Sequence, residues 1–425
     1  MAATRSTHST PGTAHSAVRQ TGTFEEFDVA IVGAGVVGLG HALAAIDRGL
    51  SVVVVDRAAD ISGASIRNFG HACVSAQSGQ ARVYAERSRE LWLRIAAETG
   101  IWLRTSGAWL VARADDEAAV LADFAAAQNG AQATAQTPAQ TTVQRPGTAE
   151  APAPVELLSA AQMRAAVPAL GADVVGGAWM RDDLQLNPRE AVPALARWLA
   201  TRGVQFRWQS AVRSVKSGVL STSRGHIAAD TIIVAVNHDI DQLFGEVAQA
   251  VGIRRCGLDM MRVRVELPGG PGTHPFALPG PLLTGWSMLR YSAFAASPAT
   301  IALRERLERQ HPQLMALDLN QMYTQLPDGS LIVGDTHYRG QSVTPFQQEG
   351  AFDALAAITS ELFGGARLQV LERWQGVYAS GPDEFLVESP LPGVHIVAAT
   401  TGIGMTCGLG LADSVIAELF EPARA

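Results

Sequence analysis

A glycine-rich turn between two apolar runs constrains the fold more strongly than any other feature of this chain. The turn reads G-A-G-V-V-G at residues 33–38 and follows the apolar run 27–32. Residues 36–48 carry apolar side chains at helical spacing, and a second apolar run covers residues 51–55. Strand, glycine turn, helix and strand in this order predict a βαβ unit with parallel strands.

The three glycines and a nearby acid are placed where a dinucleotide needs them. Gly33 makes the tight turn, Gly35 lets a pyrophosphate approach the backbone, and Gly38 lets the helix pack against the strand. The helix N-terminus then faces the anionic pyrophosphate. Asp56, followed by Arg57, ends the second strand, where its carboxylate can accept hydrogen bonds from both ribose hydroxyls of an adenosine. A glycine turn that serves packing alone would not account for Asp56, so we predict a dinucleotide site.

The composition excludes several classes of function. The chain has 425 residues, 47% of them hydrophobic, which suits a large core and two or three domains. The net charge of −7 and the pI of about 5.8 provide no broad basic field for nucleic acid or an acidic membrane. No apolar run reaches the roughly 18 residues of a membrane span. The three cysteines are far apart and form no CxxC pair, so neither a metal site nor a disulfide framework is expected.

Two segments lack the apolar side chains of a folded core. Residues 1–24 are rich in Ser and Thr and hold no apolar stretch of a secretory signal, so we expect a disordered tail on a cytoplasmic protein. Residues 125–154 are dominated by Ala, Gln, Thr, Pro and Gly, with no aromatic residue and Val143 as the only large aliphatic one. Such a segment cannot bury enough apolar surface to offset its ordering entropy. We therefore predict a disordered surface insertion there.

A second glycine-rich segment, near the C-terminus, distinguishes between dinucleotides. It reads T-T-G-I-G-M-T-C-G-L-G at 400–410, after a strand predicted at 394–398 and before a helix predicted at 412–420. Small residues at a helix N-terminus can direct backbone N–H groups at the pyrimidine edge of a flavin ring, where negative charge gathers on reduction. Close packing of a helix on a strand would explain the glycines without a ligand. With the first loop present, the pattern favours a flavin over a nicotinamide cofactor.

The two loops together resemble those of the D-amino-acid oxidase family of flavoproteins, whose members include glycine oxidase and sarcosine oxidase. The resemblance covers nearly the whole chain from Phe27 onward, apart from the insertion. It implies an α/β (α+β two-domain) fold, in which a Rossmann-like FAD-binding domain carries an inserted mixed-sheet substrate domain of the D-amino-acid oxidase/glycine oxidase type. The implied FAD-binding domain comprises residues 25–92, 183–242 and 372–425, and the implied substrate domain comprises residues 93–182 and 243–371.

The resemblance also implies non-covalent FAD. Sarcosine oxidases link the flavin to a cysteine in the stretch that corresponds to residues 374–383, and this chain has no cysteine there. Attachment through His71 is an alternative, although a pocket or packing role explains that residue better. The residues expected to bind FAD lie in the two glycine loops, after the second strand, in the loop 63–71 and on the adenine-side strand 211–215. They are Gly33, Gly35, Gly38, Asp56, Arg57, Ser65, Arg67, Asn68, Gly70, His71, Val212, Gly402, Gly404, Met405 and Thr406.

Within the family, four segments are most similar to a branch associated with bacterial phosphonate breakdown. They are S-I-R-N-F-G-H at 65–71, the pair Arg290-Tyr291, G-D-T-H-Y at 334–338 and G-I-G-M at 402–405. That branch is thought to oxidise aminophosphonates related to 2-aminoethylphosphonate. Amino-acid oxidases usually place an Arg or Lys near the positions that match 376–380 to clamp the substrate carboxylate, and this chain has no cation there. The departure disfavours an ordinary α-amino acid.

A phosphonate is best bound by arginine, bidentate where possible. In order of preference the candidates are Arg290, Arg67 and Arg339, with Tyr291 as a further substrate contact. Arg290 is expected on a strand predicted at 282–291. The candidates for catalytic residues are His337, Tyr378 and Arg290. A surface or structural role is the alternative for each, because 32 of the 33 basic residues are arginine and a buried Tyr or His with a satisfied hydrogen bond is common.

Flavin amine oxidation needs a neutral amine whose α C–H bond is aimed at flavin N5. Hydride transfer gives an imine that water hydrolyses, so this oxidative deamination needs little acid–base apparatus. The acceptor is either oxygen or a respiratory carrier, because sarcosine oxidases use a lysine near the flavin for oxygen and the only lysine, Lys216, falls on the adenine-side strands. Two alternatives stay open: a FAD-dependent dehydrogenase of a 2-hydroxy acid or D-amino acid, and a flavin-binding protein without turnover. No pattern indicates the oligomeric state.

Overall fold

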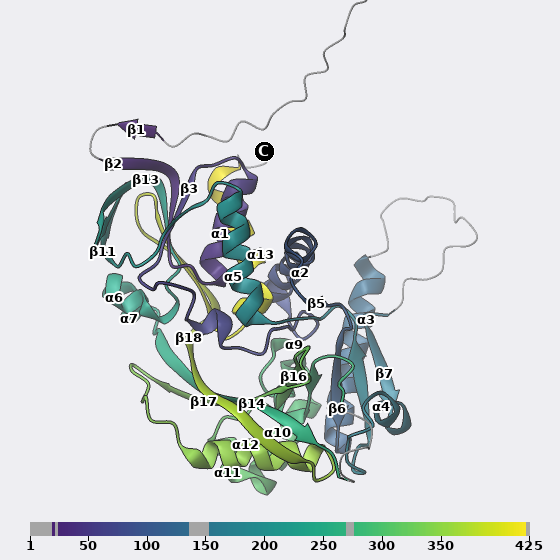
Figure 1. The fold of residues 1–425 in the computed structure, drawn as a ribbon. Coiled ribbons are helices and arrows are strands. Elements are labelled where there is room, and N and C mark those ends of the chain that lie inside the picture. Colours follow the sequence, from purple (N-terminus) through teal and green to yellow (C-terminus); the bar gives the residue numbers. More distant parts are fainter. Residues whose placement is uncertain (1–18, 22–23, 136–152, 269–275, 422–425) are drawn as a thin grey trace, which may run out of the picture.

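One long sheet runs through the molecule and joins its two parts (Figure 1). The computed structural model describes residues 19–21, 24–135, 153–268 and 276–421. Across these residues the sheet has 16 strands, ordered β10-β3-β2-β13-β19-β18-β14-β17-β16-β15-β6-β8-β7 along its main path. The first five strands are parallel and the rest are mainly antiparallel, so the two parts differ in architecture.

The parallel part is built from the βαβ unit that the sequence predicts. Its strands are β10 (Gln205–Arg207), β3 (Val52–Val55), β2 (Phe24–Val32), β13 (Gly225–Val234) and β19 (Val394–Thr401). Helix α1 (Val36–Asp47) connects β2 to β3, as the glycine turn predicts. All four residues of β3 are buried, because a parallel sheet that is covered on both faces can be apolar throughout.

Four helices share one apolar core with the parallel strands. They are α1, α2 (Gly79–Thr99), α5 (Pro188–Thr201) and α13 (Gly404–Phe420). Helix α5 begins as predicted, with the side chain of Asn187 accepting from the backbone N–H of Arg189 and Pro188 in the first turn. Helices α2 and α13 approach closely because Gly410 has no side chain: a Cβ there would lie 2.1 Å from the carbonyl oxygen of Tyr84.

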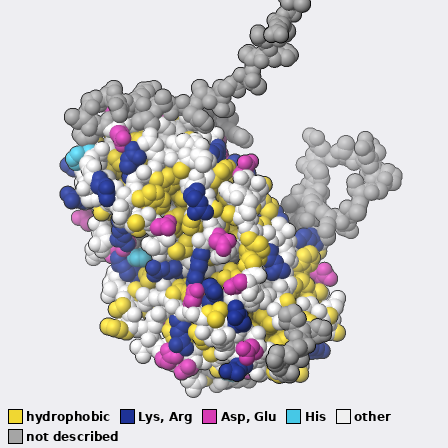
Figure 2. Space-filling model, viewed as in Figure 1, with side chains coloured by type: hydrophobic (Ala, Val, Ile, Leu, Met, Phe, Trp, Pro, Cys, Tyr) yellow, Lys and Arg dark blue, Asp and Glu magenta, His cyan; other side chains and the backbone are white. Residues whose placement is uncertain are grey.

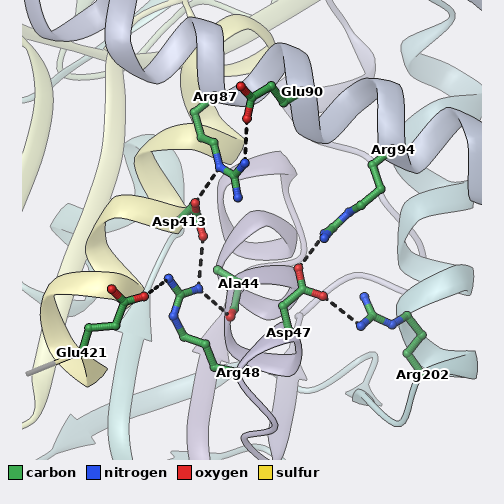
Figure 3. Close-up of polar contacts among 9 residues, drawn as sticks. All are labelled: Ala44, Asp47, Arg48, Arg87, Glu90, Arg94, Arg202, Asp413 and Glu421. Atoms are coloured by element: carbon green, nitrogen blue, oxygen red, sulfur yellow. Dashed lines mark hydrogen bonds and ion pairs between the residues drawn. The ribbon is translucent and has the colours of Figure 1, made fainter. Parts of the chain in front are cut away.

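Ion pairs connect these helices at the surface (Figure 3). Asp413 on α13 accepts from Arg48, which follows α1, at 3.1 Å and from Arg87 on α2 at 2.7 Å. Asp47, the last residue of α1, pairs in the same way with an arginine of α2 and with one that follows α5. Each partly exposed pair contributes only about 0–1 kcal/mol. Together the two carboxylates connect all four helices.

A second apolar core lies on the other face of the parallel strands. Because side chains alternate along a strand, Val52 and Val54 point into the first core and Val53 and Val55 into the second. The elements that close this second core are the hairpin β11 (Val212–Lys216) and β12 (Val219–Thr222), the 3-10 turn η2 (Asn237–Asp239), and helices α6 (Ile240–Leu243) and α7 (Gly245–Ala250).

The 25-residue strand β18 (Arg367–Leu391) belongs to both parts. Its residues 380–391 pair with β19, and its residues 367–380 pair with β14 (Arg254–Glu266). Beyond β14 come β17 (Leu331–Gly340), β16 (Met322–Gln325), β15 (Leu282–Leu283), β6 (Ala108–Ala112), β8 (Gly176–Met180) and β7 (Val155–Ser159). The parallel part is thus assembled from separated segments with a mixed sheet between them, which confirms the predicted fold class.

Helices cover the mixed sheet and bury the third core. They are α3 (Asp115–Ala135), α4 (Ala160–Ala166), α8 (Gly285–Met288), α9 (Ser292–Ala295), α10 (Ala299–Gln310), α11 (Pro312–Ala316) and α12 (Glu349–Leu362). A small separate sheet joins β4 (His71–Ala72), β9 (Leu184–Leu186) and β5 (Leu103–Arg104). The 3-10 turn η1 (Ala64–Ile66) precedes β4.

The disorder predicted from residue 125 is wrong for residues 125–135, which complete helix α3. Alanine and glutamine are good helix formers, and the helix is anchored just before this point by Phe124, whose ring lies 4.6 Å from that of Phe294. Asn129 also exchanges two hydrogen bonds with the backbone of Val155, at 3.0 and 3.2 Å. The rest of the predicted insertion falls largely on residues 136–152, which lie outside the described residues.

The predicted tail boundary at residue 24 is also too far along the chain. Strand β2 begins at Phe24, and β1 (Arg19–Thr21) pairs antiparallel with its first residues. Sequence reasoning missed this pairing because three polar residues show no apolar alternation. Residues 1–18 and 22–23 lie outside the described residues.

The surface carries charges of both signs. On the face shown in Figure 2, arginines and acidic side chains lie interspersed rather than in separate fields. Among the described residues, no helix is long and apolar enough to cross a membrane.

Candidate functional site

A cavity of about 720 Å³ crosses the boundary between the two parts of the molecule. Its lining residues come from seven of the eight neighbouring strands from β3 to β16, from the segment just after the eighth, β13, and from the N-terminal ends of α1 and α13. Neighbouring strands lie about 4.8 Å apart, so the path across them is on the order of 30 Å long. The cavity therefore suits an elongated ligand with a different environment at each end.

The first end is formed by the predicted glycine loop. Gly33 has a φ of +104°, and a Cβ there would lie 2.5 Å from the carbonyl oxygen of Ala235. A Cβ at Gly38 would lie 2.0 Å from the carbonyl oxygen of Gly33, so Gly38 permits the helix to pack on the turn without itself lining the cavity. Gly35 lines the cavity just before α1 begins. The loop thus leaves bare backbone at a helix N-terminus, which suits a phosphate.

Asp56 lies at this end and already holds the loop. Its Oδ2 accepts from the backbone N–H of Ala34 and its Oδ1 from that of Ala58, each at 2.8 Å. A carboxylate has about four acceptor sites, so capacity for hydroxyl groups remains. Arg57 lines the cavity but is exposed and donates to Asp239 at 2.6 Å. Val212, predicted on the adenine side, lies at the start of β11 and lines the same end.

The loop around η1 covers the middle of the cavity. Ser65 accepts from the backbone N–H of Val36 at 2.9 Å and so ties this loop to the start of α1. Asn68 holds the loop's own shape: it donates to two carbonyls of the loop and accepts from the N–H of Gly70 at 2.8 Å. Gly70 does not line the cavity; a Cβ there would lie 2.0 Å from a carbonyl oxygen of β9. Arg67 is exposed at the rim and donates to the carbonyl of Gln375 at 3.2 Å.

His71 is buried in the cavity wall with a partner for each ring nitrogen. Its Nε2 lies 2.8 Å from Asp183 Oδ2, and its Nδ1 lies 3.2 Å from Met322 Sδ. The thiol of Cys73 lies nearby. One potential metal-ligand atom from each of His71, Cys73 and Asp183 lies within 4.8 Å of the others. Burial raises the pKa of the Cys73 thiol well above its usual value, and the other Asp183 oxygen accepts from a backbone N–H. Protein contacts therefore account for the cluster without a metal ion.

The second glycine segment forms another part of the cavity wall. Helix α13 begins at Gly404 rather than at the predicted residue 412, because its small residues pack closely on α1 and α2. Gly402 has a φ of +81°, and a Cβ there would lie 3.1 Å from Tyr378 Cζ. Thr406 accepts from the backbone N–H of Cys73 at 3.0 Å. Gly402, Gly404, Met405 and Thr406 all line the cavity, so a second helix N-terminus opens on it.

These two helix N-termini fit FAD. One opens among bare glycine backbone, where a pyrophosphate can accept hydrogen bonds, and the other opens further along the cavity, where a ring can place its electron-rich edge. A side chain at Gly33 would collide with Ala235, and one at Gly402 would combine a positive φ with a tight contact to Tyr378, so the shape of this wall favours glycine at both positions.

The far end of the cavity carries a pair of arginines that share one acid. Arg290 donates from Nη1 to Asp318 Oδ1 at 2.9 Å, and Arg339 donates from Nη1 to Asp318 Oδ2 at 2.6 Å. Arg290 lines the cavity and Arg339 does not. The prediction that Arg290 lies on a strand is wrong: it lies in the turn after α8. A short apolar run is compatible with either a strand or a helix, so its pattern could not distinguish the two. The three side chains leave one surplus positive charge.

A buried acid and imidazole lie beside these arginines. Asp335 and His337 are two residues apart on β17, so their side chains lie on the same face of the strand, and both line the cavity. Asn320 donates from Nδ2 to Asp335 Oδ1 at 3.0 Å, and His337 Nε2 lies 3.4 Å from Asp335 Oδ2. Burial raises the pKa of Asp335 to about 7 and lowers the pKa of His337 well below its usual value. Sequence reasoning missed Asp335 and Asn320, although Asp335 stands inside the segment 334–338 that it singled out.

Two tyrosines complete the far end. The ring of Tyr378 meets that of His337 edge to face, with centroids 6.3 Å apart. Tyr291 lies with its hydroxyl 4.0 Å from Met322 Sδ. Burial raises the pKa of both phenols, so both stay neutral at neutral pH. The structure thus brings together Arg290, Tyr291, His337 and Tyr378 from the predicted set, leaves Arg67 at the rim and keeps Arg339 out of the cavity.

Comparisons with known proteins agree with this arrangement. The family model described as FAD dependent oxidoreductase (DAO) matches residues 28–419. The chain is similar in structure to glycine oxidase from Geobacillus kaustophilus, with 19% identity, a TM-score of 0.69, and coverage of 94% of this chain and 96% of that chain. L-proline dehydrogenase from P. horikoshii gives 16% identity, a TM-score of 0.70 and 94% coverage of both chains. Iminodiacetate oxidase from Chelativorans sp. BNC1 gives 17%, 0.67, and coverage of 93% and 96%. The comparison with curated proteins finds no match.

Proposed function

The chain belongs to the DAO family of FAD dependent oxidoreductases, and from that premise we propose that it oxidises the C–N bond of a small amine that carries an anionic group. The substrate class that we favour is an aminophosphonate related to 2-aminoethylphosphonate. When bound, FAD supplies the acceptor for the hydride that leaves the carbon beside the nitrogen. The residues of the chain bind, orient and desolvate the amine.

The surplus positive charge at the far end of the cavity carries this proposal. Arg290 and Arg339 share the single carboxylate of Asp318, so the cavity wall can neutralise one negative charge on a substrate. The guanidinium of Arg290 lines the cavity and can donate two parallel hydrogen bonds to a phosphonate or carboxylate. The anionic end of the substrate would therefore point toward β16 and β17.

The wall formed by β18 supports a phosphonate over an ordinary α-amino acid. Gly376, Val377 and Tyr378 line the cavity there and supply no cation. The anion must therefore reach Arg290 on another element, which favours a substrate whose anionic group is not held in the position that an oxidase of simple amino acids uses. Glycine oxidase and iminodiacetate oxidase, two of the similar structures, are named for small amines that carry carboxylates, which supports the amine class.

Non-covalent attachment of FAD is part of the proposal. The predicted residues at the two glycine loops and around η1 would hold the cofactor by hydrogen bonds and shape. His71 is engaged at both nitrogens, and burial keeps the pKa of the Cys73 thiol high, so neither is a ready nucleophile for a flavin. The electron acceptor is oxygen or a respiratory carrier. Lys216 ends β11 at the adenine side and does not line the cavity, so it cannot assist oxygen at the ring. We place the protein in the cytoplasm.

Anaerobic titration of the purified protein tests the proposal through the visible spectrum of its flavin. The panel is 2-aminoethylphosphonate, its 1-hydroxy and N-methyl derivatives, glycine, sarcosine, D-alanine and D-lactate, each added separately. We expect rapid bleaching by one or more phosphonates and slow bleaching by the others. Bleaching by glycine or D-alanine alone would replace the phosphonate with an amino acid. Bleaching by D-lactate alone would favour a 2-hydroxy acid dehydrogenase, and no bleaching at all would favour a flavin-binding protein without turnover.

A further inference from the structure

The buried pair Asp335 and His337 has a chemical capacity that hydride transfer does not use. We propose that this pair is the base that removes the proton from the substrate ammonium, so that the amine is neutral when its C–H bond breaks. The inference rests on the proposed amine oxidation. In this step an N–H bond of the ammonium breaks, an O–H bond forms on Asp335, and the electron pair stays on nitrogen. That electron pair then forms the C=N bond as the hydride leaves.

The hydrogen bonds around the pair fix where its proton can lie. His337 Nδ1 is 2.9 Å from the backbone carbonyl of Asp318, which can only accept, so Nδ1 carries hydrogen. In the neutral imidazole Nε2 is then a lone pair, and it faces Asp335 Oδ2 at 3.4 Å. The other oxygen of Asp335 accepts from Asn320. One proton therefore fits between Oδ2 and Nε2, and a pair without it can receive one from a substrate.

The charges around the pair favour exchange of that proton near neutral pH. Burial raises the pKa of Asp335 to about 7, against the opposing effect of Arg290. The groups that face the pair are Arg290, Arg339, Asp318, Tyr291, Tyr378 and Cys256. Burial raises the pKa of the two phenols and of the Cys256 thiol, so these three groups stay uncharged. The two arginines and Asp318 leave one positive charge for the anion of the substrate, and an ionised Asp335 is left for its ammonium.

The pair also lies close to the place where the flavin edge is expected. Tyr378 touches the position that a Cβ of Gly402 would take, and the edge of its ring meets His337. The pair is thus one aromatic ring away from the glycine segment at the start of α13, where the flavin edge is expected. Arg290 stands beside the pair. A short zwitterion can therefore place its anion on Arg290 and its ammonium at Asp335.

The free oxygen of Asn320 adds a second acceptor for the ammonium. Asn320 is buried and lines the cavity, its Nδ2 donates to Asp335, and the Tyr291 hydroxyl is a further neighbour of this side chain; its Oδ1 makes no direct hydrogen bond within the described residues. A buried acceptor without a donor is costly, so a ligand donor is expected there. An ammonium can donate to Asn320 Oδ1 and to Asp335 together. This contact would hold the nitrogen while its proton is transferred.

The test compares Asp335→Asn with wild type across pH 6–10, with 2-aminoethylphosphonate as the reductant under anaerobic conditions. In wild type the rate constant for flavin bleaching should rise with pH and level off above about 7. In D335N the rate constant should instead keep rising by about tenfold per pH unit toward the ammonium pKa near 10, because deprotonation then depends on the solvent alone. The rate should recover as the pH approaches 10. A merely structural loss would not recover with pH.

Asp259→Asn is the matched control. Asp259 is buried on the neighbouring strand β14, pairs in register with Thr336 and accepts from its hydroxyl, but does not line the cavity. D259N should keep the wild-type pH profile. A D335N profile that parallels wild type would overturn the assignment of the base while leaving amine oxidation intact. Failure of every amine to bleach the wild-type flavin would overturn both.

Infrared difference spectroscopy gives a readout that needs no turnover and does not depend on whether D335N folds. Adding 2-aminoethylphosphonate at pH 6 to the reduced wild-type holoenzyme, which cannot oxidise the substrate, should remove the C=O stretch of a protonated carboxyl, because an ammonium with a pKa near 10 keeps its proton at equilibrium and favours ionised Asp335. D259N should show the same loss. A carboxyl band that stays unchanged in a complex shown to have formed would contradict contact between the ammonium and Asp335.

Discussion

The two ends of the cavity differ in whether backbone or side chains form them. The end near α1 is formed by backbone: bare glycines at residues 33–38, a helix N-terminus, and an acid that holds the turn. The far end is formed by side chains from separate elements: Arg290 after α8, Asn320 before β16, Asp335 and His337 on β17, and Tyr378 on β18. The first end needs a few adjacent residues, whereas the second needs strands far apart in sequence to meet in register.

This difference separates what each end can tolerate. A backbone site depends on the absence of side chains, so adding one methyl group should abolish it. A side-chain site depends on charge and protonation, so its loss should be graded and should respond to pH and salt. Substitutions at the two ends should therefore fail in different ways.

The largest effect is expected at Gly38. In Gly38→Ala the new Cβ would lie 2.0 Å from the carbonyl oxygen of Gly33, so the turn and the helix must separate. We expect FAD affinity to fall by at least about 100-fold, which corresponds to about 3 kcal/mol. The flavin content of the purified protein measures it. Gly350→Ala on α12 is the control, because a Cβ there meets nothing within 4 Å. Full flavin content in G38A would contradict the claim that the first end of the cavity depends on the absence of side chains.

The next effect is expected at the far end. Arg290→Gln removes the guanidinium that faces the cavity, and with it one or two charge-assisted hydrogen bonds of about 1.5–3 kcal/mol. We expect kcat/KM for 2-aminoethylphosphonate to fall by about 10- to 100-fold, with the flavin still bound. Stopped-flow reduction and the flavin spectrum together separate these two quantities. Loss of the flavin in R290Q would mean that the two ends are not independent.

A smaller effect is expected from the arginine behind it. Arg339→Gln leaves Arg290 and Asp318 as a neutral pair, so the surplus charge disappears although no group that lines the cavity changes. A single charge that acts on the substrate from outside the cavity is worth about 1 kcal/mol, so the apparent Kd for an anionic amine should rise about 3- to 10-fold. The increase should shrink at high salt. An R339Q protein that binds as tightly as wild type would show that the surplus charge does not contribute.

The smallest effect is expected outside the cavity. Asp413→Asn removes the ion pairs to Arg48 and Arg87 (Figure 3). Burial would raise the pKa of Asp413, but hydrogen bonds from Arg87 and Arg48 outweigh it and lower that pKa. The carboxylate therefore stabilises the fold above the ordinary carboxyl pKa near 4, and this stabilisation is lost as pH falls through the lowered value. Denaturation should show a loss of about 1 kcal/mol at pH 7 that diminishes progressively below about pH 4. A pH-independent loss would assign the effect to packing.

The sequence predicts the fold where local pattern and tertiary contact agree. The βαβ unit, the fold class and the start of α5 at Asn187 are confirmed, because glycine geometry and helix capping are local requirements. The pattern fails where the same residues suit two structures. The apolar run 282–291 forms a helix and a turn after two strand residues, and alanine-rich residues 125–135 extend α3 because Phe124 and Asn129 anchor them.

The candidate site divides in the same way. Its glycines stand next to one another in sequence, so their pattern is visible without the structure. Asp335 is one acid among many until the register of β17 places it beside His337 and Asn320. Asp183 likewise meets His71 only through the pairing of β4 with β9. The partners of a buried charge are set by strand register, which no single segment encodes.

One comparison tests the central claim most directly: the rate of anaerobic flavin bleaching by 2-aminoethylphosphonate against that by propylamine, which lacks the anion. If Arg290 and its surplus charge select the substrate, the phosphonate should bleach the flavin at least about 10-fold more efficiently, and the advantage should collapse in R290Q. Equal efficiency for the two amines, or an advantage that R290Q retains, would contradict the account.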